Sequence, residues 1–229
     1  MSYGHPSILH PILTRADAEP DRLLYSFNTG DGRVLESYSY GGFAERTNAV
    51  AAHLRRQGAW DVGDRVLLVY PPGLEMLVAF FACLRLGVIP VPVSPPASHG
   101  FEASLSRMEF IARDCEASAV LTDRAYYWSM KLRRARTRIT SFRRRDDATT
   151  RVPWLITADA PIATVPEILP DRPDVLFLQY TSGSTRDPRG VVVTHRNVLE
   201  NGAWVFREPP VGASWLPQYH DMGSVSYTH

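Results

Sequence analysis

The residue types best suited to chemistry gather in one short segment, residues 181–190, which reads Thr-Ser-Gly-Ser-Thr-Arg-Asp-Pro-Arg-Gly. Glycine lets a backbone approach a ligand closely, so that N–H and hydroxyl groups can converge on one anion. Arg189 adds a fixed positive charge at the end of the segment. This composition predicts a loop that holds the terminal phosphates of a nucleotide. The residues expected to bind them are Thr181, Ser182, Gly183, Ser184, Thr185, Arg189 and Gly190.

Two better-known motifs do not fit this segment. Gly183 and Gly190 have the wrong spacing for the P-loop of motor and GTP-binding proteins, and valine follows where lysine and serine or threonine should stand. The run from Ser182 to Ser184 is not the glycine-flanked serine of a nucleophile elbow. On composition alone, a flexible Ser/Gly turn remains the open alternative.

The segments around the loop predict the elements that position it. The loop follows an apolar strand at 174–180 and precedes a second strand at 191–194, so we expect it to lie between two buried strands, with a helix from 195 to 206 behind them. Upstream, the chain alternates between strand and helix patterns, which predicts parallel strands with right-handed crossovers. The expected fold class is therefore α/β, with a layered, mostly parallel sheet and flanking helices. The alternating segments are strands at 65–70, 88–93, 119–122 and 154–157 and helices at 74–86, 104–115 and from 124.

The N-terminal part shows a different pattern. A short helix at 7–17 precedes two strand patterns, 23–27 and 33–38, which flank a Thr-Gly-Asp-Gly turn typical of a hairpin. Apolar residues at helical spacing then predict a helix from Phe43 to Leu54, which we expect Gly58 to end in the left-handed conformation.

Composition excludes several functional classes. The 229 residues carry 25 Lys and Arg against 24 Asp and Glu, a net charge of +1, which gives no global argument for nucleic acid or an anionic membrane. The first twenty residues lack the basic start and apolar core of a secretory signal, and the most apolar segment, 74–93, is interrupted by charges, glycine and prolines. Cys83 and Cys115 are expected to be buried thiols in a reducing cytosol. We therefore expect a cytoplasmic protein without a membrane span.

One segment is strongly basic. Residues 131–151 contain nine Lys or Arg and only two acidic residues, Asp146 and Asp147. The simplest interpretation is a solvated helix end followed by a loop. The open alternative is a patch for an acidic partner protein or a phosphate-rich ligand, whereas nucleic acid is not expected because aromatic residues are scarce there.

The full string around the loop points to a known family. Residues 180–195, followed by Asn197, resemble the phosphate-binding signature of the adenylate-forming superfamily. Two more segments match it in the same order. Residues 87–96, with two prolines before Ser94 and two after it, are similar to a strand and loop of fatty acyl-AMP ligases, and residues 215–223 resemble their substrate-site motif. The chain therefore resembles the N-terminal part of fatty acyl-AMP ligases and long-chain acyl-CoA synthetases.

The resemblance implies roles for individual residues. The hydroxyl and glycine residues 181–185 would cradle the β- and γ-phosphates of ATP, and Arg189 would act catalytically in place of the family's usual lysine. Arg186 is a second departure, because many members have a small residue there. His220 would act beside the substrate carboxylate as the other catalytic residue. The implied substrate-binding residues are Tyr219, His220, Asp221, Met222 and Gly223.

The implied reaction is attack by the carboxylate of a fatty acid on the α-phosphate of ATP, with Mg²⁺ as the accompanying ion. Pyrophosphate leaves, and the acyl group passes from the adenylate to a thiol of an acyl carrier protein or of coenzyme A.

The family motifs for adenine, ribose and magnesium, and the C-terminal domain with the catalytic lysine, have no counterpart before His229. Residues 1–229 are thus expected to be an incomplete N-terminal adenylation domain, truncated or acting with a separately encoded remainder. The alternative is a non-catalytic, degenerate half that binds nucleotide or an acidic carrier protein.

Overall fold

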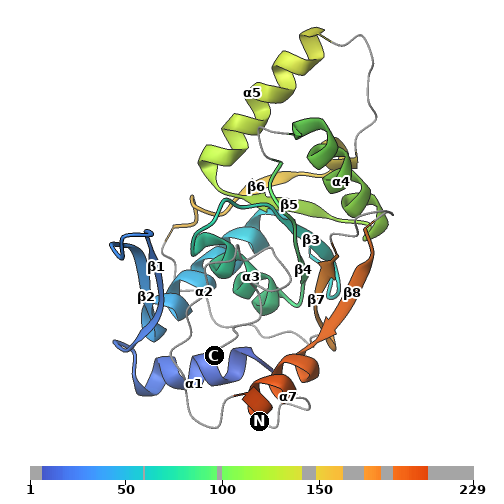
Figure 1. Ribbon diagram of the computed structural model, residues 1–229. Coiled ribbons are helices and arrows are strands. Elements are labelled where there is room, and N and C mark those ends of the chain that lie inside the picture. Colours follow the sequence, from blue (N-terminus) through green and yellow to red (C-terminus); the bar gives the residue numbers. More distant parts are fainter. Residues whose placement is uncertain are drawn as a thin grey trace.

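The protein has an α/β fold built around a parallel sheet, as Figure 1 shows. The computed structural model describes residues 7–58, 60–96, 100–140, 148–161, 173–181 and 188–205. The four-stranded sheet has the order β4-β3-β5-β6, and all three of its strand pairs are parallel. This arrangement confirms the predicted alternation of strands and helices. Its strands are β3 (Arg65–Leu68), β4 (Ile89–Pro92), β5 (Ala119–Thr122) and β6 (Trp154–Ile156).

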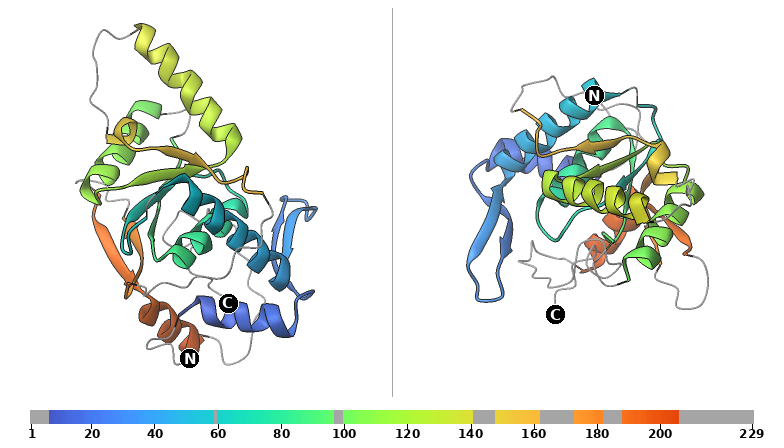
Figure 2. Two further views of the ribbon diagram at one scale, coloured as in Figure 1. Left: turned by 180° about the vertical axis from the view of Figure 1, so that it is seen from behind. Right: turned by 90° about the horizontal axis from the view of Figure 1, so that it is seen from above.

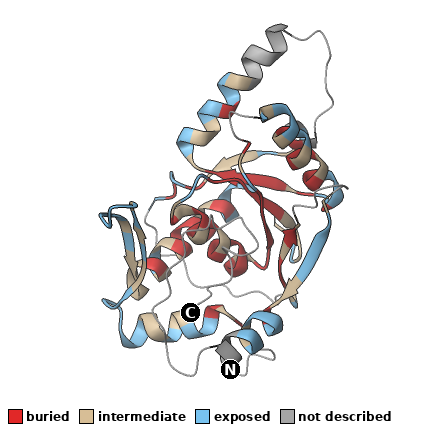
Figure 3. Cartoon of the chain, viewed as in Figure 1, coloured by how far each residue is buried: buried red, intermediate tan, exposed pale blue. Residues whose placement is uncertain are grey.

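Helices cover both faces of this sheet because both sides of its strands are apolar. Val66 and Leu68 of β3 pack in one cluster with α2 (Tyr40–Gln57) and α3 (Glu75–Leu86), whereas Leu67 and the adjoining Val69 pack in a second cluster with α4 (Phe101–Asp114) and α5 (Arg124–Thr140). Successive side chains of a strand point to opposite faces, so one apolar run supplies two cores. Figure 3 shows β3, β4 and β5 buried along most of their length, whereas β6 at the edge of the sheet is half-buried. The helices that connect them are α3 (Glu75–Leu86), α4 (Phe101–Asp114), α5 (Arg124–Thr140) and α6 (Ala148–Arg151).

The N-terminal elements lie beside the sheet. Helix α1 (Leu9–Ala18) precedes the antiparallel hairpin of β1 (Leu23–Asn28) and β2 (Val34–Ser39), which stands at the side of the molecule in both views of Figure 2. Helix α2 (Tyr40–Gln57) follows directly, with the Ser39 hydroxyl accepting a hydrogen bond from the N–H of Gly42. The predicted hairpin and helix are both confirmed.

The end of α2 corrects one prediction. Gly58 is extended, with φ −168° and ψ 164°, and not left-handed. The indole Nε1 of Trp60 donates to the carbonyl oxygen of Leu54 at 2.7 Å, so a side chain satisfies one of the last helical carbonyls. Gly87 after α3 does adopt the left-handed conformation, with φ 72°, and its N–H bonds to the carbonyls of Cys83 and Leu84.

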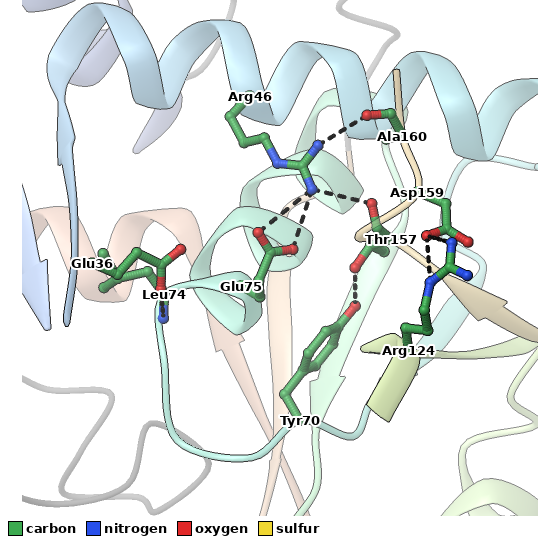
Figure 4. A network of polar contacts seen from close by, with 9 residues as sticks. All are labelled: Glu36, Arg46, Tyr70, Leu74, Glu75, Arg124, Thr157, Asp159 and Ala160. Atoms are coloured by element: carbon green, nitrogen blue, oxygen red, sulfur yellow. Dashed lines mark hydrogen bonds and ion pairs between the residues drawn. The ribbon is translucent and has the colours of Figure 1, made fainter. Parts of the chain in front are cut away.

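A polar network ties the chain after β6 to the helices (Figure 4). Arg46 of α2 donates to a carboxylate oxygen of Glu75 at 3.4 Å and to the carbonyls of Thr157 at 3.3 Å and Ala160 at 3.1 Å. The phenol of Tyr70 and the hydroxyl of Thr157 share a buried hydrogen bond of 2.8 Å. The side chains at this end of the sheet are therefore held by one another.

The basic segment begins on α5, which extends away from the sheet in Figure 1. Lys131 is exposed and its ammonium lies over the rings of Tyr127 and Trp128, at 5.6 and 4.9 Å from their centroids. The side chains at 134–140 and all of 141–147 lie outside the described part, so an acidic partner for this segment stays a prediction. None of the helices in the described residues is both long and apolar enough to cross a membrane.

Candidate phosphate-binding site

The candidate loop is carried by an antiparallel strand pair, β7 (Val175–Tyr180) and β8 (Gly190–Thr194). Tyr180 pairs with Gly190 in register, and the N–H of Thr181 donates to the carbonyl oxygen of Arg189 at 3.1 Å. That hydrogen bond closes the base of the loop. The expectation of two buried strands holds only for β7. Residues 190–192 of β8 are exposed because, in the described part of the chain, β7 is the sole strand beside β8 and no helix covers its outer side (Figure 3).

Position 190 requires a glycine because the ring of Tyr180 packs directly against its backbone. A Cβ atom built at this glycine would lie 3.0 Å from Cζ and 3.2 Å from the hydroxyl oxygen of the tyrosine ring. Such separations are tighter than ordinary van der Waals contacts, so the absence of a side chain lets the ring lie against the start of β8. Gly190 therefore serves the packing of the loop stem.

Helix α4 holds the stem through two side chains. Arg107 donates from Nη2 to the carbonyl oxygen of Thr181 at 2.8 Å. The Tyr180 hydroxyl donates to Oδ2 of Asp114, the last residue of α4, at 2.6 Å. Burial raises the pKa of Tyr180, and the hydrogen bond to Asp114 raises it further, so the phenol keeps its proton at neutral pH. In Figure 1 the start of β8 lies close to α4, as these contacts require.

Arg189 is the charged residue of the loop whose position is described. It is exposed, and its guanidinium forms no hydrogen bond or ion pair with any side chain in the described residues. Its backbone is nevertheless fixed by the bond from Thr181. The site thus pairs an anchored backbone with a cation that can turn toward an anion.

The helix behind the loop, α7 (His195–Val205), begins with a local cap. Oδ1 of Asn197 accepts from the N–H and the hydroxyl of Thr194, at 2.9 and 2.7 Å, and the N–H of Asn197 donates back to that hydroxyl. His195 is buried, and its ring Nδ1 accepts from the backbone N–H of Ile8 at 3.4 Å. The backbone N–H of His195 donates to the carbonyl oxygen of Asp174. These motif residues fix the helix and join it to α1.

The structure tests only part of the predicted site. It brings Thr181, Arg189 and Gly190 together at the base of the loop. The rest of the predicted phosphate loop and the second departure from the family pattern lie outside the described residues, as does the whole substrate motif. Their roles stay predictions. These residues are Ser182, Gly183, Ser184, Thr185, Arg186, Tyr219, His220, Asp221, Met222 and Gly223.

Arg107, Asp114 and Tyr180 were not among the residues predicted for this site. Tyr180 stands directly before the loop, but nothing in its sequence neighbourhood names a partner on α4. Within the described residues, no group of three or more His, Cys, Asp or Glu side chains is placed to hold a metal ion. The expected magnesium therefore gains no support from this part of the chain.

Comparison with known proteins gives the family. The profile described as "AMP-binding enzyme" matches residues 13–228, and the chain belongs to that family. It is 33% identical over 221 residues to a medium-chain-fatty-acid–acyl-carrier-protein ligase of Moorena producens, covering 92% of this chain and 35% of that protein. It is 35% identical over 233 residues to a long-chain-fatty-acid–AMP ligase of Mycolicibacterium smegmatis, covering 96% of this chain and 35% of that protein.

A solved structure agrees with these relatives. A fatty acyl-adenylate ligase from Legionella pneumophila, crystallised with acyl adenylate and pyrophosphate, superposes with a TM-score of 0.74 at 30% identity. The match covers 95% of this chain and 36% of that one. The fold is thus that of the N-terminal part of adenylate-forming enzymes, and the chain spans about 35% of the length of the curated relatives it matches.

Proposed function

We propose that residues 181–190 bind the β- and γ-phosphates of ATP, within an enzyme that activates a fatty acid as its acyl adenylate. The observation that carries this proposal is the anchored stem, in which Thr181 and Arg189 close a hydroxyl- and glycine-rich loop beside an exposed guanidinium. Membership of the AMP-binding enzyme family supports the same assignment.

The proposed chemistry is adenylyl transfer. A carboxylate oxygen of the fatty acid attacks the α-phosphorus, the bond from that phosphorus to the bridging oxygen breaks, and pyrophosphate leaves with the electron pair. The loop and Arg189 stabilise the negative charge of the departing pyrophosphate, so they act by positioning and charge neutralisation. His220 and its neighbours from Tyr219 to Gly223 are proposed to bind the acyl substrate near its carboxylate.

Mg²⁺ is proposed as the ion that accompanies ATP; among the described residues, no cluster of three or more His, Cys, Asp or Glu side chains is placed to hold it. The relatives' names support a fatty acid as substrate, and the Moorena relative's name includes an acyl carrier protein. We propose a thiol of such a carrier or of coenzyme A as acceptor. We assign residues 1–229 to the N-terminal part of an adenylation domain. The residues that bind adenine and ribose would belong to the rest of that domain, and the catalytic lysine to a C-terminal domain.

Titration of the chain with ATP and with pyrophosphate by calorimetry tests the proposal. The Ser184→Ala/Thr185→Val double variant should lose most of the affinity for both ligands, because it removes two hydroxyl donors from the loop. Ser129→Ala, which removes an exposed hydroxyl on α5, is the matched control and should bind as the wild type does. Equal affinities in the double variant and the wild type would refute the assignment.

The reaction itself needs a separate assay. Fatty-acid-dependent ATP–pyrophosphate exchange should be absent for residues 1–229 alone, because the loop supplies phosphate contacts and not the whole adenylation site. Robust exchange by these residues alone would contradict the assignment to part of a domain. Exchange that appears only when a separately encoded C-terminal polypeptide is added would support it.

A further inference from the structure

We infer that Arg107 and Asp114 of α4 are positioning residues for the phosphate loop, an inference that rests on the proposed function of that loop. Both residues contact the loop stem, and neither lies within the loop. Arg107 reaches the carbonyl of Thr181, and Asp114 accepts from the hydroxyl of Tyr180. Together they connect one helix to the first strand of the stem.

The two side chains are suited to act together because of their spacing. They are seven residues apart, which places them on the same face of an α-helix, roughly 10 Å apart along its axis. Helix α4 is itself fixed, since Leu105, Met108 and Ile111 are buried in the core cluster on one face of the sheet. Because the core holds α4 in place, a side chain of α4 that bonds to the stem holds the stem in place relative to the core.

Arg107 orients the point at which the loop begins. A peptide group is planar, so a bond to the carbonyl oxygen of Thr181 fixes the whole peptide group that leads into the loop. The N–H of the same residue donates to the carbonyl oxygen of Arg189, directly before β8. Thr181 is thus fixed on both its backbone polar groups, before any phosphate is bound.

Asp114 holds the end of the loop in place through the side chain of Tyr180. The ring of Tyr180 packs against Gly190, and its hydroxyl is tied to Asp114 at 2.6 Å. The ring can therefore not turn away from Gly190 without losing that hydrogen bond. The first residue of β8, directly after Arg189, is placed by the same contact.

The expected consequence is a preorganised phosphate site. Donors that converge on an anion bind it best when their geometry is already set, because little ordering then remains to be done on binding. Freeing either end of the loop should weaken phosphate binding even though no phosphate-contacting group is removed.

Two readouts on the 229-residue chain test this inference. The first is amide hydrogen exchange of residues 175–181 and 188–194 without ligand; the second is the dissociation constant for pyrophosphate. Arg107→Met and Asp114→Ala should each speed exchange of the stem and weaken pyrophosphate binding about threefold to tenfold, the effect of one hydrogen bond. Arg107→Lys and Asp114→Asn, which keep a donor or an acceptor, should restore most of the loss.

Arg113→Met is the matched control, because Arg113 is an exposed arginine of the same helix whose side chain forms no hydrogen bond or ion pair with the stem among the described residues. It should change neither readout. Unaltered stem exchange in Arg107→Met and Asp114→Ala would overturn the anchoring, whether or not pyrophosphate binds. Faster exchange with an unchanged dissociation constant would overturn the positioning role. Failure of the wild type to bind pyrophosphate would contradict the proposed function instead.

Discussion

Replacing Gly190 by alanine tests the packing of the loop stem. The new methyl group would lie 3.0 Å from Cζ, 3.2 Å from the hydroxyl and 3.3 Å from Cε2 of Tyr180. The ring cannot yield freely because Asp114 holds its hydroxyl. Overpacking of this kind costs about 1–3 kcal/mol, and the entropy that alanine removes from the unfolded chain offsets roughly 0.4–1 kcal/mol of it. We expect Gly190→Ala to lower the free energy of unfolding by roughly 1–2 kcal/mol.

Urea denaturation of matched variants measures this difference. Gly30→Ala is the control, since a Cβ at Gly30 meets no atom within 4 Å, and it should be close to neutral. Tyr180→Phe removes both the crowded hydroxyl and its anchor, so Gly190→Ala should cost less in that background than in the wild type. Equal stability of Gly190→Ala and Gly30→Ala would refute the packing argument.

Three further predictions concern other groups. Burial raises the pKa of Tyr70 well above 10, so the stability that the protonated phenol contributes is complete below pH 10 and is lost as the pH rises further. Tyr70→Phe should therefore flatten the alkaline fall in the free energy of unfolding, measured by urea denaturation. At pH 8 the same variant should lower the free energy of unfolding by about 1 kcal/mol, because Thr157 loses its hydrogen bond to the phenol. Burial raises the pKa of Cys83 to about 12 and that of Cys115 to about 11, so neither thiol should react with a colorimetric disulfide reagent at pH 8 until the protein unfolds; prompt reaction would contradict their burial. Arg189→Gln should weaken pyrophosphate binding about tenfold or more in a calorimetric titration, whereas Arg189→Lys should keep most of the affinity because it keeps the charge; equal affinities for Arg189→Gln and the wild type would remove Arg189 from the site.

The sequence predicts local features of this fold well and spatial ones only in part. Alternating strand and helix patterns identify the parallel sheet because a buried strand and its crossover helix leave a regular apolar signal. The left-handed Gly87 follows from its place after an apolar helix. Gly58 occupies a similar place but is extended, because Trp60 supplies the cap from its side chain. The exposure of β8 could not be predicted from its valines, since burial depends on which elements lie beside a strand.

At the candidate site, too, the residues within one segment could be predicted, whereas their distant partners could not. Thr181, Arg189 and Gly190 could be predicted from composition and spacing within one segment. Their anchors could not, because Asp114 lies 66 residues before Tyr180 and Arg107 lies 74 residues before Thr181. A hydrogen bond across such a separation follows from how α4 packs on the sheet, and no local pattern encodes it.

Mapping pyrophosphate on the chain by amide hydrogen exchange tests the central claim most directly. If the loop holds the phosphates of ATP, saturating pyrophosphate should slow exchange in peptides covering residues 181–190. The turn at Thr29–Gly32, which also contains a hydroxyl and two glycines but no arginine, should be unaffected. Protection at 181–190 that disappears in Ser184→Ala/Thr185→Val is the predicted result. No protection there, or equal protection at the turn, would contradict the assignment of this loop as the phosphate site.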